Sequence, residues 1–166
     1  MGRTLAVIKP ETFDQREEIK TDIKENDFHI VKNKTLRWHR ELIERTYTKE
    51  KLNYGSERAN EVMSLIIPDL IFDNFGENPK IEALILSSKG NTIEDFVRLC
   101  GPTNAFDYLR KEFEKTLRGK YGLGPEKSFV KTIDGIVCRF YFNGTHRTST
   151  QEEYEEEKEI YFGKII

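Results

Sequence analysis

Apolar residues along the chain follow two kinds of spacing, one typical of β-strands and the other of α-helices. The two kinds follow one another along the chain and predict alternating strands and helices. Residues 4–8 and 81–86 are nearly continuous apolar runs, which are typical of buried strands. Residues 28–38 alternate loosely between apolar and polar, which predicts another strand. The segments 127–131 and 136–142 flank an Asp-Gly turn and predict a β-hairpin.

Helical spacing separates these strands. It predicts helices over residues 14–26, 40–52, 56–67, 92–100 and 103–113. Pro68 is expected to end the third of them, because proline lacks the backbone donor that a helix interior needs. Ser149 precedes Glu152 by three residues, a capping-box spacing that predicts a final acidic helix.

The order of elements predicts an α+β protein with one domain over residues 1–166. Two β-α-β units feeding one antiparallel sheet give a ferredoxin-like split β-α-β arrangement. We expect the helices on one face of this sheet and the predicted hairpin as an insertion before the histidine at position 146. No repeat or linker interrupts the pattern.

Composition narrows the classes of function. A net charge of −2 and a pI near 6.0 argue against nucleic-acid binding, which requires a basic face. No run approaches the ~18 apolar residues of a membrane span, and residues 1–9 carry no apolar signal segment. We therefore expect a cytoplasmic protein without membrane partners. Two cysteines are too few for a metal quartet, and we predict no metal held by side chains alone.

His146 has the most suggestive context of the three histidines. It follows Asn143 by three residues and stands just before the predicted N-terminus of the acidic helix. A neutral imidazole there can act as a nucleophile, and the helix N-terminus favours an arriving phosphate. A packed or surface ring is nevertheless the commoner role for a lone histidine.

Two cations could hold a phosphate near such a nucleophile. Lys9 follows the first predicted strand and is fixed by Pro10, and Arg118 stands where a helix meets a loop. A guanidinium group offers two parallel donors to phosphate. Taken alone, a solvated lysine is at least as good an interpretation of Lys9, and an ordinary surface salt bridge is the better interpretation of Arg118.

Five segments together resemble the nucleoside diphosphate kinase family. They follow the family order over nearly the whole chain: Arg3–Glu11, Val97–Asn104, Thr116–Gly119, Asn143–His146 and Lys158–Ile160. The fourth contains the Asn-x-x-His motif of the family's active-site histidine. The resemblance implies a ferredoxin-like domain that transfers a γ-phosphate from nucleoside triphosphates to nucleoside diphosphates, with Mg²⁺ as the accompanying cofactor.

The resemblance also implies roles for individual residues. His146 would carry the phosphate between two half-reactions, Lys9 would contact the transferring phosphate and the ribose, and Glu159 would orient the histidine. The nucleotide would be bound by Lys9, Arg98, Thr103, Arg118 and Asn143. The family has its second phosphate arginine at the position that Val97 occupies here, and Arg98 stands one position later.

Several departures from the family pattern surround the histidine. Arg147–Ser149 replaces Gly-Ser-Asp and brings bulk and charge where the family has its smallest residue. The 28 positions from Arg118 to His146 are roughly twice the family spacing, which predicts the inserted hairpin. About two extra residues precede Glu159, and no aromatic pair for stacking a base follows Tyr47.

Two functions stay open on the sequence. The first is an active nucleoside diphosphate kinase acting through a phosphohistidine, with nucleoside di- and triphosphates as its partners. The alternative is a catalytically degenerate module that serves as a structural or binding component of a larger assembly, such as a ciliary axoneme. That reading implies a cytoskeletal or ciliary location, and a homo-oligomer fits either one.

Overall fold

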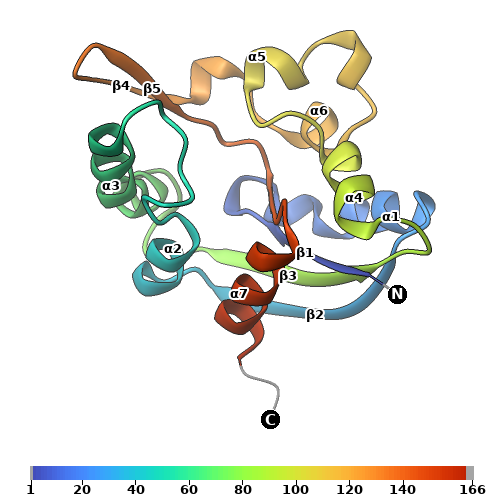
Figure 1. The fold of residues 1–166 in the computed structure, drawn as a ribbon. Coiled ribbons are helices and arrows are strands. Elements are labelled where there is room, and N and C mark those ends of the chain that lie inside the picture. Colours follow the sequence, from blue (N-terminus) through green and yellow to red (C-terminus); the bar gives the residue numbers. More distant parts are fainter. Residues whose placement is uncertain (1, 164–166) are drawn as a thin grey trace.

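The main sheet has four antiparallel strands; three of them are predicted from the sequence, and the fourth, which contains His146, is not. The structure, a computed structural model, describes residues 2–163 (Figure 1). The strands are β1 (Arg3–Ile8), β2 (His29–Arg37), β3 (Lys80–Ser87) and β6 (Thr145–Arg147), in the order β2-β3-β1-β6. This order confirms the ferredoxin-like α+β fold, with β1 and β3 in the centre of the sheet.

Helices cover both faces of the sheet, which corrects the prediction of one covered face (Figure 1). One face carries α1 (Arg16–Glu25) and α4 (Thr92–Cys100), and the other carries α2 (Arg40–Thr46), α3 (Glu57–Phe75) and α7 (Gln151–Phe162). The reason lies in β1, whose residues alternate between two apolar clusters. Both faces of the central strands are therefore buried, and each face needs helices.

The helices predicted over residues 40–52 and 56–67 end at other residues than predicted. The helix predicted over 40–52 ends at Thr46, and the one predicted to stop before Pro68 continues through it to Phe75. A proline removes one donor from a helix, and here burial of Leu70 and Ile71 beyond it outweighs that loss.

The segment 103–113 holds only short helical turns. The chain forms α5 (Ala105–Tyr108), becomes extended at Arg110 and then forms the 3-10 helix η2 (Lys111–Phe113). The remaining short helices are η1 (Pro10–Gln15), α6 (Leu117–Tyr121) and η3 (Pro125–Lys127). These turns place Arg118 in α6, beside the histidine strand β6.

The predicted hairpin is confirmed, as β4 (Phe129–Ile133) and β5 (Ile136–Phe140). Asp134 and Gly135 have φ of 50° and 79°, as the tight turns of hairpins require. The hairpin forms a separate two-stranded sheet packed against α3, rather than the fourth strand of the main sheet. That fourth strand is β6, so His146 lies within a strand.

The final helix begins one residue later than predicted. Thr150 is its N-cap and accepts a hydrogen bond from Glu153 N at 3.1 Å, while Ser149 N donates to Glu153 Oε2 at 2.6 Å. Thr150 and Glu153 therefore form a variant of the capping box, in which Glu153 bonds the backbone one residue before the N-cap. This phase turns Tyr154, Glu157 and Tyr161 toward the core.

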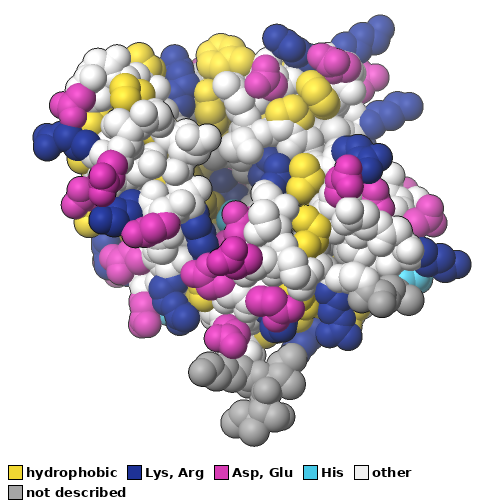
Figure 2. Space-filling model, viewed as in Figure 1, with side chains coloured by type: hydrophobic (Ala, Val, Ile, Leu, Met, Phe, Trp, Pro, Cys, Tyr) yellow, Lys and Arg dark blue, Asp and Glu magenta, His cyan; other side chains and the backbone are white. Residues whose placement is uncertain are grey.

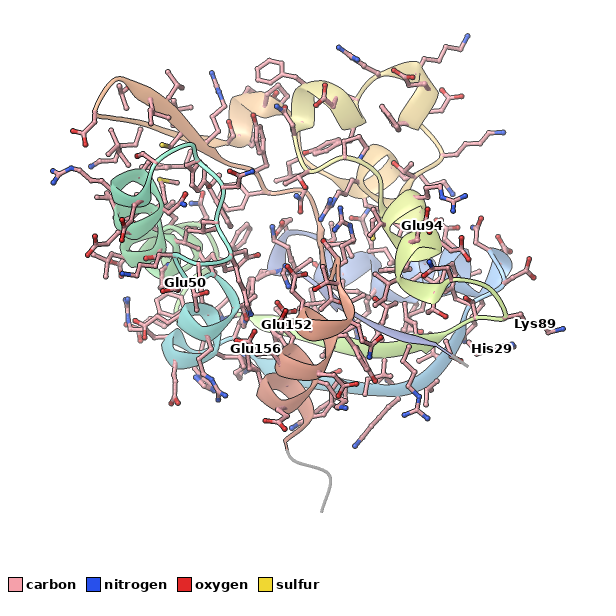
Figure 3. All side chains as sticks on the ribbon, viewed as in Figure 1. His29, Glu50, Lys89, Glu94, Glu152 and Glu156 are labelled. Atoms are coloured by element: carbon pink, nitrogen blue, oxygen red, sulfur yellow. The ribbon has the colours of Figure 1, made fainter. Side chains whose placement is uncertain are left out.

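Acidic side chains gather over the outer side of α7 at the centre of one face (Figure 2). Glu152 and Glu156 belong to this exposed side (Figure 3). Among residues 2–163, no helix has the length and apolar character that crossing a membrane requires.

Two tyrosines of α7 differ in their hydrogen bonds, and replacing each with phenylalanine tests how much the hydrogen bonds of Tyr161 stabilise the packing of this helix. Tyr161 Oη accepts from Trp38 Nε1 at 3.2 Å and lies 2.6 Å from Thr46 Oγ1, whereas the buried Tyr154 Oη has no partner within residues 2–163. We expect Tyr161→Phe to lower the free energy of unfolding by about 1–3 kcal/mol, and Tyr154→Phe to leave it unchanged or raise it. Urea denaturation measures both, and equal losses would contradict the assigned anchoring role.

Candidate functional site

The pairing of β1 with β6 brings the candidate residues together. His146 pairs with Val7, and Lys9 N donates to Gly144 O at 3.0 Å directly beyond that pair. Around them lies a cavity of about 220 Å³, which Thr103, Arg118, Asn143, His146 and Lys9 all line. The sequence analysis proposed six residues that bind the nucleotide or carry its phosphate. Five of them line this cavity, and the sixth, Arg98, does not.

His146 pairs with Glu157, and this corrects the expectation for Glu159. Nε2 of His146 lies 2.8 Å from Glu157 Oε2, and the Glu157 side chain is only 1% exposed. Glu159 lies on the exposed side of α7, because residues two apart on a helix are about 200° apart around its axis. Because of the extra residues before the Lys-Glu-Ile segment, the glutamate that matches the family motif, Glu159, is not the glutamate that faces the histidine, Glu157.

Neighbouring groups hold this pair in place. Lys51, in the connection after α2, donates to Glu157 Oε1 at 3.4 Å, and the Tyr47 ring packs edge-on against the imidazole with centroids 5.6 Å apart. Burial acts to raise the pKa of Glu157, but the charges and hydrogen bonds of His146 and Lys51 lower it overall. Glu157 is therefore ionised at neutral pH and can fix the ring through Nε2.

Lys9 is buried and fully engaged with the protein. Its ammonium group contacts Tyr141 O at 3.2 Å, Asn143 Oδ1 at 3.3 Å and Glu11 Oε1 at 3.2 Å. Burial lowers the pKa of Lys9, and the neighbouring Glu11 carboxylate opposes that change. Glu11 also accepts from Gly144 N at 3.1 Å, so it ties the lysine to the histidine loop.

Arg118 is also buried and has no carboxylate partner among residues 2–163. Its guanidinium group donates to Thr145 O at 2.9 and 3.2 Å, to Gly101 O at 3.0 Å and to Thr103 Oγ1 at 3.3 Å. Burial lowers the pKa of Arg118 to about 10. Asn143 Nδ2 completes this wall by donating to Thr103 O at 3.3 Å.

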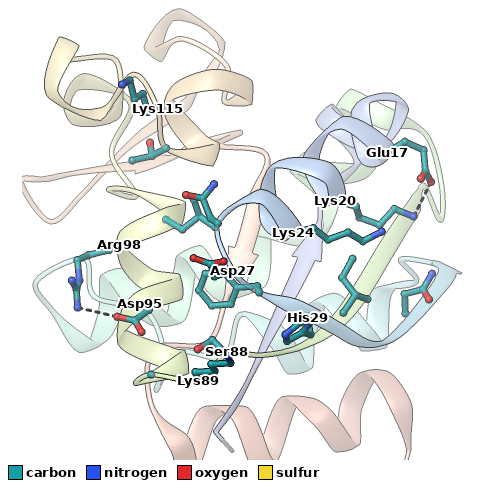
Figure 4. A pocket seen from close by; sticks show the side chains of 17 residues that line it. Glu17, Lys20, Lys24, Asp27, His29, Ser88, Lys89, Asp95, Arg98 and Lys115 are labelled. Atoms are coloured by element: carbon teal, nitrogen blue, oxygen red, sulfur yellow. Dashed lines mark hydrogen bonds and ion pairs between the residues drawn. The ribbon is translucent and has the colours of Figure 1, made fainter.

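Arg98 lies elsewhere, which corrects its expected place in the site. Its side chain is 71% exposed and pairs with Asp95 at 3.1 Å on the outer side of α4 (Figure 4). It borders a groove of about 1410 Å³ between α1, β2 and α4, which shares no lining residue with the His146 cavity. The one-position shift from Val97 turned this arginine away, since neighbours on a helix are about 100° apart.

The cavity has more basic than acidic side chains despite the negative net charge. Its basic lining residues are Lys9, Lys51, Arg118, Arg139 and Arg147, and its acidic ones are Glu153 and Glu157. Such a lining attracts anions. Glu157 and Lys51 were not singled out from the sequence. The spacing from His146 was the only available signal for Glu157, and nothing in the local sequence marks Lys51.

Comparisons with known proteins identify the family of this chain. A family model described as nucleoside diphosphate kinase matches residues 2–165. Nucleoside diphosphate kinase 6 of Xenopus tropicalis is 27% identical over 166 residues, covering 95% of this chain and 83% of that protein. A thioredoxin domain-containing protein 3 homolog of Ciona intestinalis is 27% identical over 161 residues, or 97% of this chain. This chain covers only 20% of the length of the Ciona protein.

Solved structures share the fold at low sequence identity. A nucleoside diphosphate kinase of Borrelia burgdorferi, described as a transition-state mimic with bound vanadate and ADP, has a TM-score of 0.69 at 18% identity. That alignment covers 97% of this chain and 86% of the other. An apo nucleoside diphosphate kinase of Encephalitozoon cuniculi has a TM-score of 0.67 at 20% identity, with 99% and 90% covered.

Proposed function

Because the chain belongs to the nucleoside diphosphate kinase family, we propose that it transfers the γ-phosphate of nucleoside triphosphates to nucleoside diphosphates through a phosphohistidine at His146. The observation that carries the proposal is the pair between His146 Nε2 and the buried Glu157. This pair assigns the ring proton to Nε2, so Nδ1 keeps its lone pair. No residue among 2–163 forms a hydrogen bond with Nδ1.

In the first half-reaction, Nδ1 of His146 attacks the γ-phosphorus. A nitrogen–phosphorus bond forms as the bond from phosphorus to the bridging oxygen breaks, and the departing nucleoside diphosphate keeps that electron pair. Nε2 keeps its proton, and the carboxylate of Glu157 offsets the positive charge that develops on the ring. In the second half-reaction, a terminal oxygen of another nucleoside diphosphate attacks the phosphohistidine and restores the neutral ring.

The surrounding residues would bind and orient the nucleotide. Thr103, Arg118 and Asn143 line the cavity, where Thr103 and Arg118 would contact the phosphates and Asn143 would contact the ribose. Lys9 would contact the transferring phosphate if its ammonium group exchanges one of its protein acceptors for a phosphate oxygen. Mg²⁺ would enter as part of the nucleotide substrate, bound to its phosphate oxygens.

One pair of observations favours a second candidate function, a non-catalytic module of a larger assembly. The Ciona relative is about five times longer than the matched region, so a related domain can form part of a long chain. The cavity of about 220 Å³ is also smaller than the ~300–1,000 Å³ of most ligand pockets. Under this reading the chain would act by binding, in a cytoskeletal or ciliary location.

Incubation with γ-labelled ATP and Mg²⁺ separates the two functions. We expect acid-labile, base-stable label on the protein, which is the behaviour of a phosphohistidine, and its removal when an unlabelled nucleoside diphosphate is added. The label should appear in the nucleoside triphosphate formed from that acceptor. A protein that stays unlabelled at millimolar ATP would instead support the non-catalytic module.

A further inference from the structure

Most of the N–H groups that could bind a phosphate in this cavity already donate hydrogen bonds to other groups of the protein. Lys9 has three N–H donors and three acceptors within 3.3 Å. Arg118 uses four of its five donors on backbone carbonyls and the Thr103 hydroxyl. Lys51 is held by Glu157, Glu156 and Arg45 O. These cations supply charge, but they have few free hydrogens to offer a phosphate.

Arg147 differs from them in this respect. It lines the same cavity as His146, and within residues 2–163 the only hydrogen bond of its side chain is from Nη1 to Ser149 Oγ at 2.5 Å. Its Nε atom is buried without a partner. A buried guanidinium donor without an acceptor is costly, and a phosphate oxygen is the acceptor that its planar fork fits best.

The charges around Arg147 also favour an anion. Arg118 and Arg147 both line the cavity, and neither has a carboxylate within salt-bridge distance among the described residues. Burial is the main cause that lowers the pKa of Arg118, and the positive charge of Arg147 lowers it further. An anion between the two guanidinium groups would remove this repulsion.

We infer that Arg147 is the main phosphate donor beside His146 and takes the place that Arg98 cannot fill. It would bind the phosphate chain together with the remaining free donor of Arg118. Glu153 lines the same cavity and Glu94 lines the adjoining groove of about 510 Å³ that Arg147 also borders. These carboxylates compete for the guanidinium group, so affinity for the phosphate chain should be moderate. The inference rests on the proposed function only in taking the ligand to be a nucleotide.

Calorimetric titration with inorganic pyrophosphate tests this role without requiring phosphoryl transfer. We expect Arg147→Ala to weaken pyrophosphate binding by about 10- to 150-fold, the loss typical of one hydrogen-bonded charge contact. Arg147→Lys, which keeps the charge and loses the planar fork, should bind with intermediate affinity. Arg98→Ala is the matched control, and its affinity should equal that of the wild type.

Three results would overturn the inference: unchanged binding by Arg147→Ala, tighter binding by it, or no wild-type binding at millimolar pyrophosphate. Tighter binding would mean that Arg147 obstructs the cavity. Thermal unfolding of each variant checks that the fold persists, and Arg147→Lys decides the matter if the alanine variant does not fold. Parallel labelling with γ-labelled ATP keeps the two proposals apart. Normal labelling of Arg147→Ala together with wild-type pyrophosphate affinity rejects the inference alone, whereas intact pyrophosphate binding by the wild type without any labelling rejects the kinase proposal alone.

Discussion

Replacing His146 with glutamine is expected to abolish labelling by γ-labelled ATP while leaving the protein folded. Glutamine has no nucleophilic nitrogen, since its amide lone pair is delocalised. Its amide nitrogen can take roughly the place of Nε2 and keep the hydrogen bond to Glu157, which is 2.8 Å long in the wild type. We expect no detectable phosphoprotein and a free energy of unfolding within about 1 kcal/mol of the wild type.

The alanine variant should behave differently in stability. His146→Ala removes the hydrogen-bond partner of Glu157, whose side chain is 1% exposed, and leaves Lys51 as the nearest compensating charge. We expect a loss of about 1–3 kcal/mol in the free energy of unfolding, together with the loss of labelling. His29→Ala is the matched control, because His29 is exposed on β2 and outside the cavity. Label persisting in the glutamine variant would place the chemistry on another residue.

Local patterns predicted the parts of the fold that are set by local physics. The apolar runs at β1 and β3, the helical spacing of α4 over residues 92–100 and the Asp-Gly turn of the hairpin each depend on neighbouring residues, and each was predicted. The path of α3 through Pro68 could not be predicted in this way. Burial against the rest of the core outweighs the missing backbone donor, and that burial is visible only in three dimensions.

The site was predictable in its positions and less so in its contacts. His146 and Lys9 meet because β1 pairs with β6, Arg118 joins them through its hydrogen bonds to Thr145 O, and the family motifs marked all three. Arg98 and Glu159 were misplaced for the same reason. Both lie on helices, and both were assigned by comparing residue types with the family motifs. A shift of one or two residues turns a helical side chain by about 100° or 200°.

Glu157→Gln should therefore slow phosphorylation of the protein strongly, and Glu159→Gln should not. A glutamine at position 157 can present its amide donor to Nε2, which favours the tautomer with the proton on Nδ1 and occupies the attacking lone pair. It also removes the negative charge that offsets the ring in the phosphorylated state. We expect single-turnover labelling to slow by roughly 10²- to 10⁴-fold, the scale seen when a carboxylate that fixes a catalytic histidine is neutralised.

The two variants form a close pair, since both exchange one carboxylate for an amide on α7 and change the net charge equally. Only Glu157 contacts the imidazole, so a purely electrostatic effect of the acidic helix would slow both variants by similar factors. Nucleotide affinity should stay near the wild-type value in each, because neither side chain is assigned a contact with the phosphate chain or the base. A loss confined to the labelling rate of Glu157→Gln would mean that the carboxylate acts on the nucleophile, since removing an interaction made only in the transition state lowers the rate without weakening binding.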